Sequence, residues 1–151
     1  MSVVAWDGKR IAADKMALSA GLCMTTSKIR RSARTGEILA WTGQHDKGLV
    51  LAAWFDEGAD PAKYPAFQTT DDWCRLIVAS EAGVFSYETQ CVPLSFENAF
   101  QAWGSGRDYA LGAMAMGADA IQAVEIASRL CEGCGNGVEC FALTAHLEVA
   151  A

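Results

Sequence analysis

The first fourteen residues, MSVVAWDGKRIAAD, constrain the fold more than any other stretch because they predict a β-hairpin. An apolar run, Val3–Trp6, leads to Asp7-Gly8, and a second run, Lys9–Ala13, leads back to Asp14. An Asp-Gly pair between two alternating runs is a strong hairpin signal, since glycine takes the positive φ angles of a tight turn. We therefore expect two paired antiparallel strands here.

The residue in front of this hairpin is a candidate nucleophile. Initiator methionine is generally removed when the next side chain is small, so we expect Ser2 to carry a free α-amino group once Met1 is removed. A hydroxyl nucleophile and an amine base on one residue form a known solution to nucleophile activation. The simpler alternative is that Ser2 only permits the removal of Met1.

The length of 151 residues predicts a single domain over residues 1–151, large enough to bury a core. A net charge of −6 argues against a nucleic-acid partner, and the basic cluster Lys28-Ile29-Arg30-Arg31 is interpreted as a solvated strand end. The sequence shows no secretory signal and no stretch long enough to span a membrane. We therefore expect a cytoplasmic protein without a membrane partner.

Six cysteines in a chain without an export signal are expected to be free thiols. Cys131-x-x-Cys134, with Cys140 nearby, has the spacing of a metal site or a redox pair. No second such pair follows, and neither His45 nor His146 lies at zinc-finger spacing. The favoured interpretation is a tight glycine loop of small residues, so neither a metal nor a cofactor is expected.

The remaining pattern predicts mostly strands first and helices later, which suits a layered α+β domain. Residues 15–21 are small and polar and predict a loop, whereas residues 96–103 leave the choice between strand and loop open. Strands are expected at 22–24, 27–33, 37–42, 73–80, 84–89 and 138–149, and helices from 46 to about 58 and over 107–116 and 118–130.

Four patches of the sequence carry a resemblance to a known family. They are S-V-V-A-W-D-G-K-R-I-A-A-D at 2–14, S-K-I-R-R at 27–31, W-T-G at 41–43, and G-S-G-R-D-Y-A-L-G at 104–112. Together they resemble the proteasome β-subunit family of the N-terminal-nucleophile (Ntn) hydrolases, and in particular the small bacterial and phage-type members related to the HslV peptidase. The first and fourth patches are specific when taken jointly.

The resemblance implies a four-layer αββα sandwich and assigns a role to each matching residue. Ser2 matches the position of the family's nucleophile, Asp14 that of its buried carboxylate, and Lys28 that of its site lysine. Gly43, within one residue, matches the position whose backbone amide forms the oxyanion hole, and Ser105 matches a serine that hydrogen-bonds near the amine. The family carries an Asp and a Ser where this chain has Cys131 and Cys134.

These residue types suit acyl transfer. An ordinary α-amine has a pKa of about 7.7–8.0, much nearer neutrality than that of a lysine, so it can accept the Ser2 proton. A lysine beside the amine, paired with Asp14, disfavours charging of the amine. A backbone N–H at Gly43 would stabilise the oxyanion, an effect of roughly 3–4 kcal/mol per donor. The resemblance thus implies a threonine/serine-type endopeptidase that cleaves peptide bonds.

Each assignment has a simpler alternative. Asp14 could cap a turn, Lys28 could belong to the solvated basic face, and Ser105 could cap a helix with Asp108 in its first turn. A dinucleotide-binding fingerprint is disfavoured because the last glycine of G-x-G-x-x-G is missing after Gly104.

Three functions remain open from the sequence. The first is a self-compartmentalised peptidase, for which the family implies a homo-oligomer of stacked rings, peptide or unfolded-protein substrates and an ATP-dependent unfoldase. The second is a catalytically inactive, oligomeric structural protein that keeps the Ntn fold. The third is an amidohydrolase for a small amide. A shared fold cannot choose among them.

Overall fold

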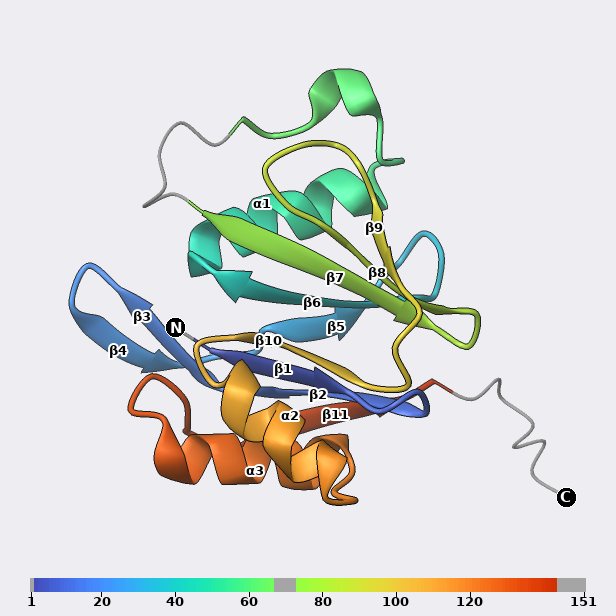
Figure 1. The fold of residues 1–151 in the computed structure, drawn as a ribbon. Helices are drawn as coiled ribbons and strands as arrows, with labels where there is room; N and C mark the ends of the chain where they lie inside the picture. The colour runs from blue at the N-terminus through green and yellow to red at the C-terminus, as the bar shows by residue number, and fades with distance from the viewer. Residues whose placement is uncertain (1, 67–72, 144–151) are drawn as a thin grey trace, which may run out of the picture.

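The computed structural model describes residues 2–66 and 73–143, which form three sheets and three α-helices (Figure 1). In chain order the elements are β1 (Val3–Trp6), β2 (Arg10–Asp14), β3 (Met16–Ser19), β4 (Leu22–Thr25), β5 (Ile29–Arg31), β6 (Ile38–Gly43), α1 (His45–Asp56), a short 3-10 helix (Pro61–Lys63), β7 (Cys74–Ser80), β8 (Gly83–Tyr87), β9 (Leu94–Phe96), β10 (Gln101–Gly104), α2 (Arg107–Ala115), α3 (Ala120–Leu130) and β11 (Val138–Ala142).

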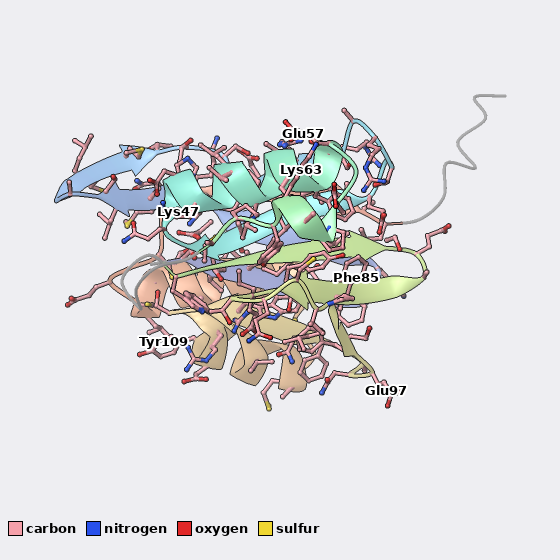
Figure 2. The ribbon with its side chains drawn as sticks, turned by 90° about the horizontal axis from the view of Figure 1, so that it is seen from above. Lys47, Glu57, Lys63, Phe85, Glu97 and Tyr109 are labelled. Carbon is pink, nitrogen blue, oxygen red and sulfur yellow. The ribbon has the colours of Figure 1, made fainter. Side chains whose placement is uncertain are left out.

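The two larger sheets are antiparallel and lie face to face. One has the strand order β10-β1-β2-β11 and the other the order β5-β6-β7-β8-β9, while β3 and β4 form a separate hairpin. Figure 1 shows α1 over the outer face of the second sheet and the pair α2 and α3 over the outer face of the first. In Figure 2, seen from above, Lys47 marks the first turn of α1 and Glu57 its C-terminal end.

The expected N-terminal hairpin is confirmed. Val4 pairs with Ala13 and Trp6 with Ile11, so the turn falls at Asp7-Gly8. Gly8 has a φ of +86°, and Asp7 Oδ1 accepts hydrogen bonds from the backbone N–H groups of Lys9 (2.9 Å) and Arg10 (2.8 Å). The Asp-Gly pair therefore closes the turn with both its side chain and its backbone freedom.

Three apolar clusters fill the spaces between these layers. The cluster between the two sheets takes every second residue of β1, β2, β6 and β7. Its members Val4, Ile11, Ala40 and Ile77 are fully buried. The opposite faces of the same strands pack on the helices. Both faces of these strands are thus buried, which explains why their sequences are almost continuously apolar.

Two stretches differ from the sequence-based expectation. Residues 15–21 were expected to be a loop, but β3 pairs with β4 in register from Met16–Thr25 to Ser19–Leu22. The turn between them uses positive φ angles at Ala20 (+48°) and Gly21 (+82°), which fits a two-residue hairpin. The ambiguous residues 96–103 divide between two sheets, since β9 pairs with β8 and β10 pairs with β1.

The three predicted helices are confirmed, each with bounds within a few residues of those expected. The predicted strand over 138–149 is observed as β11 up to Ala142, and residues 144–149 lie outside the described residues. All six cysteines are free, as expected. In the described part of the chain, no helix is long and apolar enough to cross a membrane.

Candidate active site

Ser2 lies immediately before β1, at the end of the four-stranded sheet where β10 runs into α2. The backbone N–H of Ser2 donates to Ser105 Oγ over 3.2 Å. The Ser2 carbonyl accepts from the backbone N–H of Gly106 (3.2 Å) and from Ser105 Oγ (3.3 Å). The pairing of β1 with β10, which sets Val3 opposite Gly104, brings these residues together.

The Ser2 hydroxyl is buried without a hydrogen-bond partner among the described residues. A buried hydroxyl without a partner is unfavourable. Trp6 Nε1, Thr42 Oγ1 and Ser86 Oγ are likewise buried without a partner among the described residues, so Ser2 is distinguished by its position rather than by this feature alone. The backbone N–H and carbonyl of Ser2 are both bonded, so the local fold fixes the backbone of this residue and leaves only Oγ without a partner.

Asp14, the last residue of β2, forms the centre of a buried polar network. Its Oδ1 accepts from the Val3 backbone N–H (3.0 Å) and from the Lys28 ammonium (2.5 Å). Its Oδ2 accepts from the backbone N–H groups of Met16 (3.3 Å) and Gly135 (3.0 Å). Asp14 thus links the residue after Ser2 to Lys28 and to the loop after α3.

Lys28 lies just before β5 and points into the molecule. It is 3% exposed, and its ammonium also donates to the Met16 carbonyl over 2.5 Å. Burial lowers the pKa of Lys28, while the Asp14 carboxylate acts in the opposite direction. The interpretation of Lys28 as part of a solvated basic face is therefore wrong, because its charge is paired inside the protein.

A cavity of about 620 Å³ lies beside Ser2 and contains three of the five predicted site residues. Its walls are formed by Ser2, Gly43, Trp73, Arg75, Gly104, Ser105 and Arg107. Asp14 and Lys28 lie behind this wall, joined to it through the Val3 amide. The fold thus brings all five predicted residues to one end of the sheets, in two groups.

Gly43 and Gly104 are positions where a side chain would not fit. Gly43 ends β6 with a φ of +97°, and a Cβ there would lie 2.4 Å from the Trp73 carbonyl oxygen. Gly104 ends β10 with a φ of +95°, and a Cβ there would lie 2.2 Å from the Ser2 carbonyl oxygen. Both glycines therefore allow the backbone to approach the cavity closely.

Ser105 does not cap α2. The N-cap of that helix is Gly106, and no side chain hydrogen-bonds to the cap, although Asp108 lies in the first turn as expected. The Ser105 hydroxyl contacts Ser2 instead, so the helix-cap interpretation is wrong. Asp14 does bond to turn amides, but it also holds Lys28, so its turn-capping and site interpretations are compatible.

The loop after α3 supplies two contacts that the sequence did not indicate. Cys134 Sγ lies 3.9 Å from Ser105 Oγ, and the neighbouring Gly135 donates its amide to Asp14. Burial, followed by the charge of Asp14, raises the pKa of Cys134 to about 12. The backbone groups of Met16, Gly106 and Gly135 have no sequence signal, because any residue type supplies them.

Comparison with solved structures places this geometry in a known fold. Thiobacillus denitrificans BPH matches with a TM-score of 0.67 and 22% identity, covering 95% of this chain and 98% of that one. The same protein in complex with epoxomicin matches with a TM-score of 0.68, 22% identity and coverage of 95% and 99%. Eukaryotic HslV from Trypanosoma brucei matches with a TM-score of 0.67, 16% identity and coverage of 95% and 99%.

These neighbours are HslV-like, proteasome-type subunits, so the chain has a proteasome-type fold and the expected resemblance is confirmed. Within that class the likeness is to BPH and HslV over nearly the whole chain. No protein-family model and no curated protein matches the sequence.

Proposed function

We propose that the protein is an Ntn hydrolase that cleaves peptide bonds with Ser2 as the nucleophile after removal of Met1. The observation that carries the proposal is the buried, unpartnered Ser2 hydroxyl at the wall of a cavity, with its own nitrogen held by Ser105. The fold shared with BPH, which has been solved in complex with epoxomicin, supports the same conclusion.

In the proposed reaction, Ser2 Oγ attacks the carbonyl carbon of the substrate while the Ser2 α-amine takes the hydroxyl proton. A backbone N–H at Gly43 stabilises the oxyanion that forms in the cavity. The C–N bond then breaks, and the amine passes its proton to the leaving nitrogen. A water molecule, deprotonated by the same amine, hydrolyses the acyl-Ser2 ester.

Lys28 and Asp14 support this chemistry from behind the cavity. The Lys28 ammonium places a positive charge near the Ser2 amine, which disfavours protonation of that amine. Asp14 holds Lys28 and, through the Val3 amide, fixes the first peptide unit after Ser2. Ser105 orients the amine itself. Each of the five residues therefore has a separate part in the reaction.

The proposal extends to the assembly. Residues 1–151 form one domain with the four-layer αββα arrangement of Ntn hydrolases, and copies associate into a homo-oligomer, with stacked rings, in the cytoplasm. Three separate apolar clusters, one between the sheets and one under each helical layer, support the four layers. Peptides or unfolded proteins are the substrates, delivered by an ATP-dependent unfoldase.

Intact-mass measurement combined with epoxomicin labelling tests the proposal. We expect the purified protein to lack Met1, which lies outside the described residues, and to gain the mass of one inhibitor on Ser2. An epoxyketone can react with both the hydroxyl and the free amine of an N-terminal serine, so labelling reports both groups. Ser2→Ala should abolish labelling and peptide hydrolysis, whereas Ser2→Thr, which keeps a hydroxyl, should retain them.

The result that would overturn the proposal is a retained Met1, or peptide hydrolysis unchanged in Ser2→Ala. A protein that forms rings without labelling or hydrolysis would instead be an inactive structural relative. Hydrolysis of small non-peptide amides without hydrolysis of peptides would identify an amidohydrolase.

A further inference from the structure

A Cys-x-x-Cys pair lies at the end of α3, next to the proposed site. Cys131 is the C-cap of α3, and the Cys134 N–H donates to the Cys131 carbonyl over 3.1 Å across a turn at residues 132 and 133. The first and fourth Cα atoms of a β-turn lie within about 7 Å, and a disulfide needs about 4.4–6.8 Å. The backbone therefore holds the two cysteines at a separation close to that of a disulfide.

The Cys131 thiol lies near enough to Cys134 to contribute to the raised pKa of Cys134. The two thiols differ in exposure, since Cys134 is 3% exposed whereas Cys131 is only half-buried. Cys131 is therefore the sulfur that a small oxidant reaches first. The raised pKa of Cys134 agrees with this order, because a thiol that stays protonated near neutral pH is the weaker nucleophile toward the oxidant.

We propose that Cys131 and Cys134 form a reversible dithiol–disulfide pair that is oxidised by peroxide and controls the neighbouring site. The Cys131 thiolate attacks one oxygen of hydrogen peroxide, so an S–O bond forms, the O–O bond breaks and hydroxide leaves. The Cys134 sulfur then attacks the Cys131 sulfur, so an S–S bond forms and the S–O bond breaks. The oxygen leaves as water with the Cys134 proton, and a dithiol reductant reverses the oxidation.

Two contacts connect this pair to the residues around Ser2. Cys134 Sγ lies 3.9 Å from Ser105 Oγ, and a Cβ on Gly106 would lie only 2.8 Å from the same sulfur, so Cys134 packs directly on this segment. The next residue, Gly135, donates its amide to Asp14. A movement of Cys134 would therefore shift Ser105, which holds the Ser2 nitrogen, and Asp14, which holds Lys28.

Formation of the bond would displace Cys134. The sulfur atoms of a disulfide are about 2.05 Å apart, closer than two free thiols can approach, so the Cys134 sulfur is drawn toward Cys131. This removes the sulfur neighbour of Ser105 and strains the Gly135 contact with Asp14. The effect on activity rests on the proposed function, whereas the disulfide itself does not.

The surroundings favour a disulfide over a metal site. Within residues 2–66 and 73–143, no group of three or more His, Cys, Asp or Glu side chains is arranged to hold a metal ion. Two sulfurs alone do not complete the four-coordinate shell of a structural zinc.

Thiol counting by mass tests the pair independently of any hydrolase activity. The reduced full-length protein is treated with hydrogen peroxide, denatured and alkylated, then digested for peptide mapping. The reduced chain has six alkylatable thiols, and the oxidised chain should have two fewer, with Cys131 and Cys134 joined in one peptide. Dithiothreitol should restore all six. Retention of six thiols, or a disulfide between other cysteines, would overturn the proposal.

Matched variants assign the bond. Cys131→Ser should lose the paired oxidation completely, while Cys23→Ser, which removes an exposed cysteine elsewhere, should leave the Cys131–Cys134 bond unchanged. If Cys131→Ser still loses two thiols on oxidation, the assignment is wrong.

Epoxomicin labelling and peptide hydrolysis test the coupling to the site. We expect oxidation to lower the labelling rate about five- to tenfold, the effect of one lost hydrogen bond, and reduction to restore it. Cys131→Ser should keep the reduced rate under peroxide. If the disulfide forms but the labelling rate does not change, the proposal that the pair controls the site is wrong. If the reduced protein is not labelled at all, the proposed hydrolase function is wrong instead.

Discussion

The Lys28 ammonium lies 2.5 Å from Asp14 Oδ1, and the two side chains are 3% and 0% exposed. A buried ion pair of this kind contributes little net stability, because both charges lose their hydration. Removing one partner is costly, however, since the other charge is left unpaired. Variants of Lys28 and Asp14 can therefore separate the contribution of this pair to stability from its contribution to function.

We expect Lys28→Met to lower the free energy of unfolding by about 3–5 kcal/mol, because Asp14 would remain as an unpaired buried charge. Urea unfolding measures this loss, and Lys63→Met, at an exposed lysine, should change it by less than about 0.5 kcal/mol.

The double variant Lys28→Met/Asp14→Asn separates the two roles. It removes both charges while the Asn oxygen can still accept from a backbone amide, so it should regain part of the lost stability. Epoxomicin labelling of Ser2 should stay low, because the positive charge that the proposed mechanism places near the amine is gone. Full labelling in the double variant would exclude a function for the pair.

Ser105→Ala tests whether the contact with the Ser2 nitrogen matters for reaction. Ser105 is exposed and its hydroxyl bonds to the Ser2 nitrogen and carbonyl, so we expect little loss of stability but about a tenfold fall in kcat/KM. Ser128→Ala is a matched control, because among the described residues that hydroxyl bonds only to the Val124 carbonyl on α3. Equal rates for the two variants would contradict the role of Ser105.

Local signals explain what could be predicted of the fold. Asp7-Gly8 indicates its hairpin by residue type, and the apolar spacing of α3 indicates an amphipathic helix, so these elements were predicted correctly. The β3–β4 hairpin was missed because Ala20, at a φ of +48°, carries no turn signal and MALS is not a strand pattern. Tertiary pairing supplies what the local sequence lacks.

The candidate site depended on the resemblance more than on patterns. Ser2, Asp14 and Lys28 are far apart or unremarkable in sequence, and the burial of Lys28 cannot be read from a basic run such as SKIRR. Whether Gly43 acts as the oxyanion donor stays a prediction. The contact between Cys134 and Ser105 joins residues 29 positions apart, so spacing alone could not indicate it.

Asp56 offers a prediction about pH. Its carboxylate accepts hydrogen bonds from Arg30 (2.5 Å), within β5, and from Ser32 (2.6 Å), just after it, so it joins the end of α1 to this strand. Burial alone would raise the pKa of Asp56, but the bonds from Ser32 and Arg30 outweigh it and lower the pKa below its ordinary 3.8.

A carboxyl with a lowered pKa in the folded state stabilises the protein when ionised. We therefore expect Asp56→Asn to lower the free energy of unfolding by about 1 kcal/mol at every pH above the ordinary pKa. This difference from the wild type should disappear as the pH falls through the lower pKa of the folded state. Urea unfolding at a series of acid pH values measures it. Asp108→Asn, at a side chain 83% exposed, serves as a surface control and should change the free energy of unfolding by less than about 0.5 kcal/mol.

Gly104→Ala tests the close approach of β10 to Ser2. A Cβ at this position would lie 2.2 Å from the Ser2 carbonyl oxygen and would also be strained by the φ of +95°. Gly36→Ala separates these effects, because Gly36 has a φ of +77° but open space around it. We expect Gly36→Ala to cost about 1 kcal/mol of stability from backbone strain alone, with labelling of Ser2 unchanged.

Gly104→Ala should cost several kcal/mol more than Gly36→Ala, because the clash forces Ser2 away from Gly106 and Ser105. Thermal unfolding and epoxomicin labelling, measured on both variants, give the comparison. In the folded fraction of Gly104→Ala the labelling rate should fall at least tenfold, since displacement of a nucleophile by about 1 Å has a large effect on rate. Similar stability and labelling in the two variants would show that the close contact between β10 and Ser2 does not position the nucleophile.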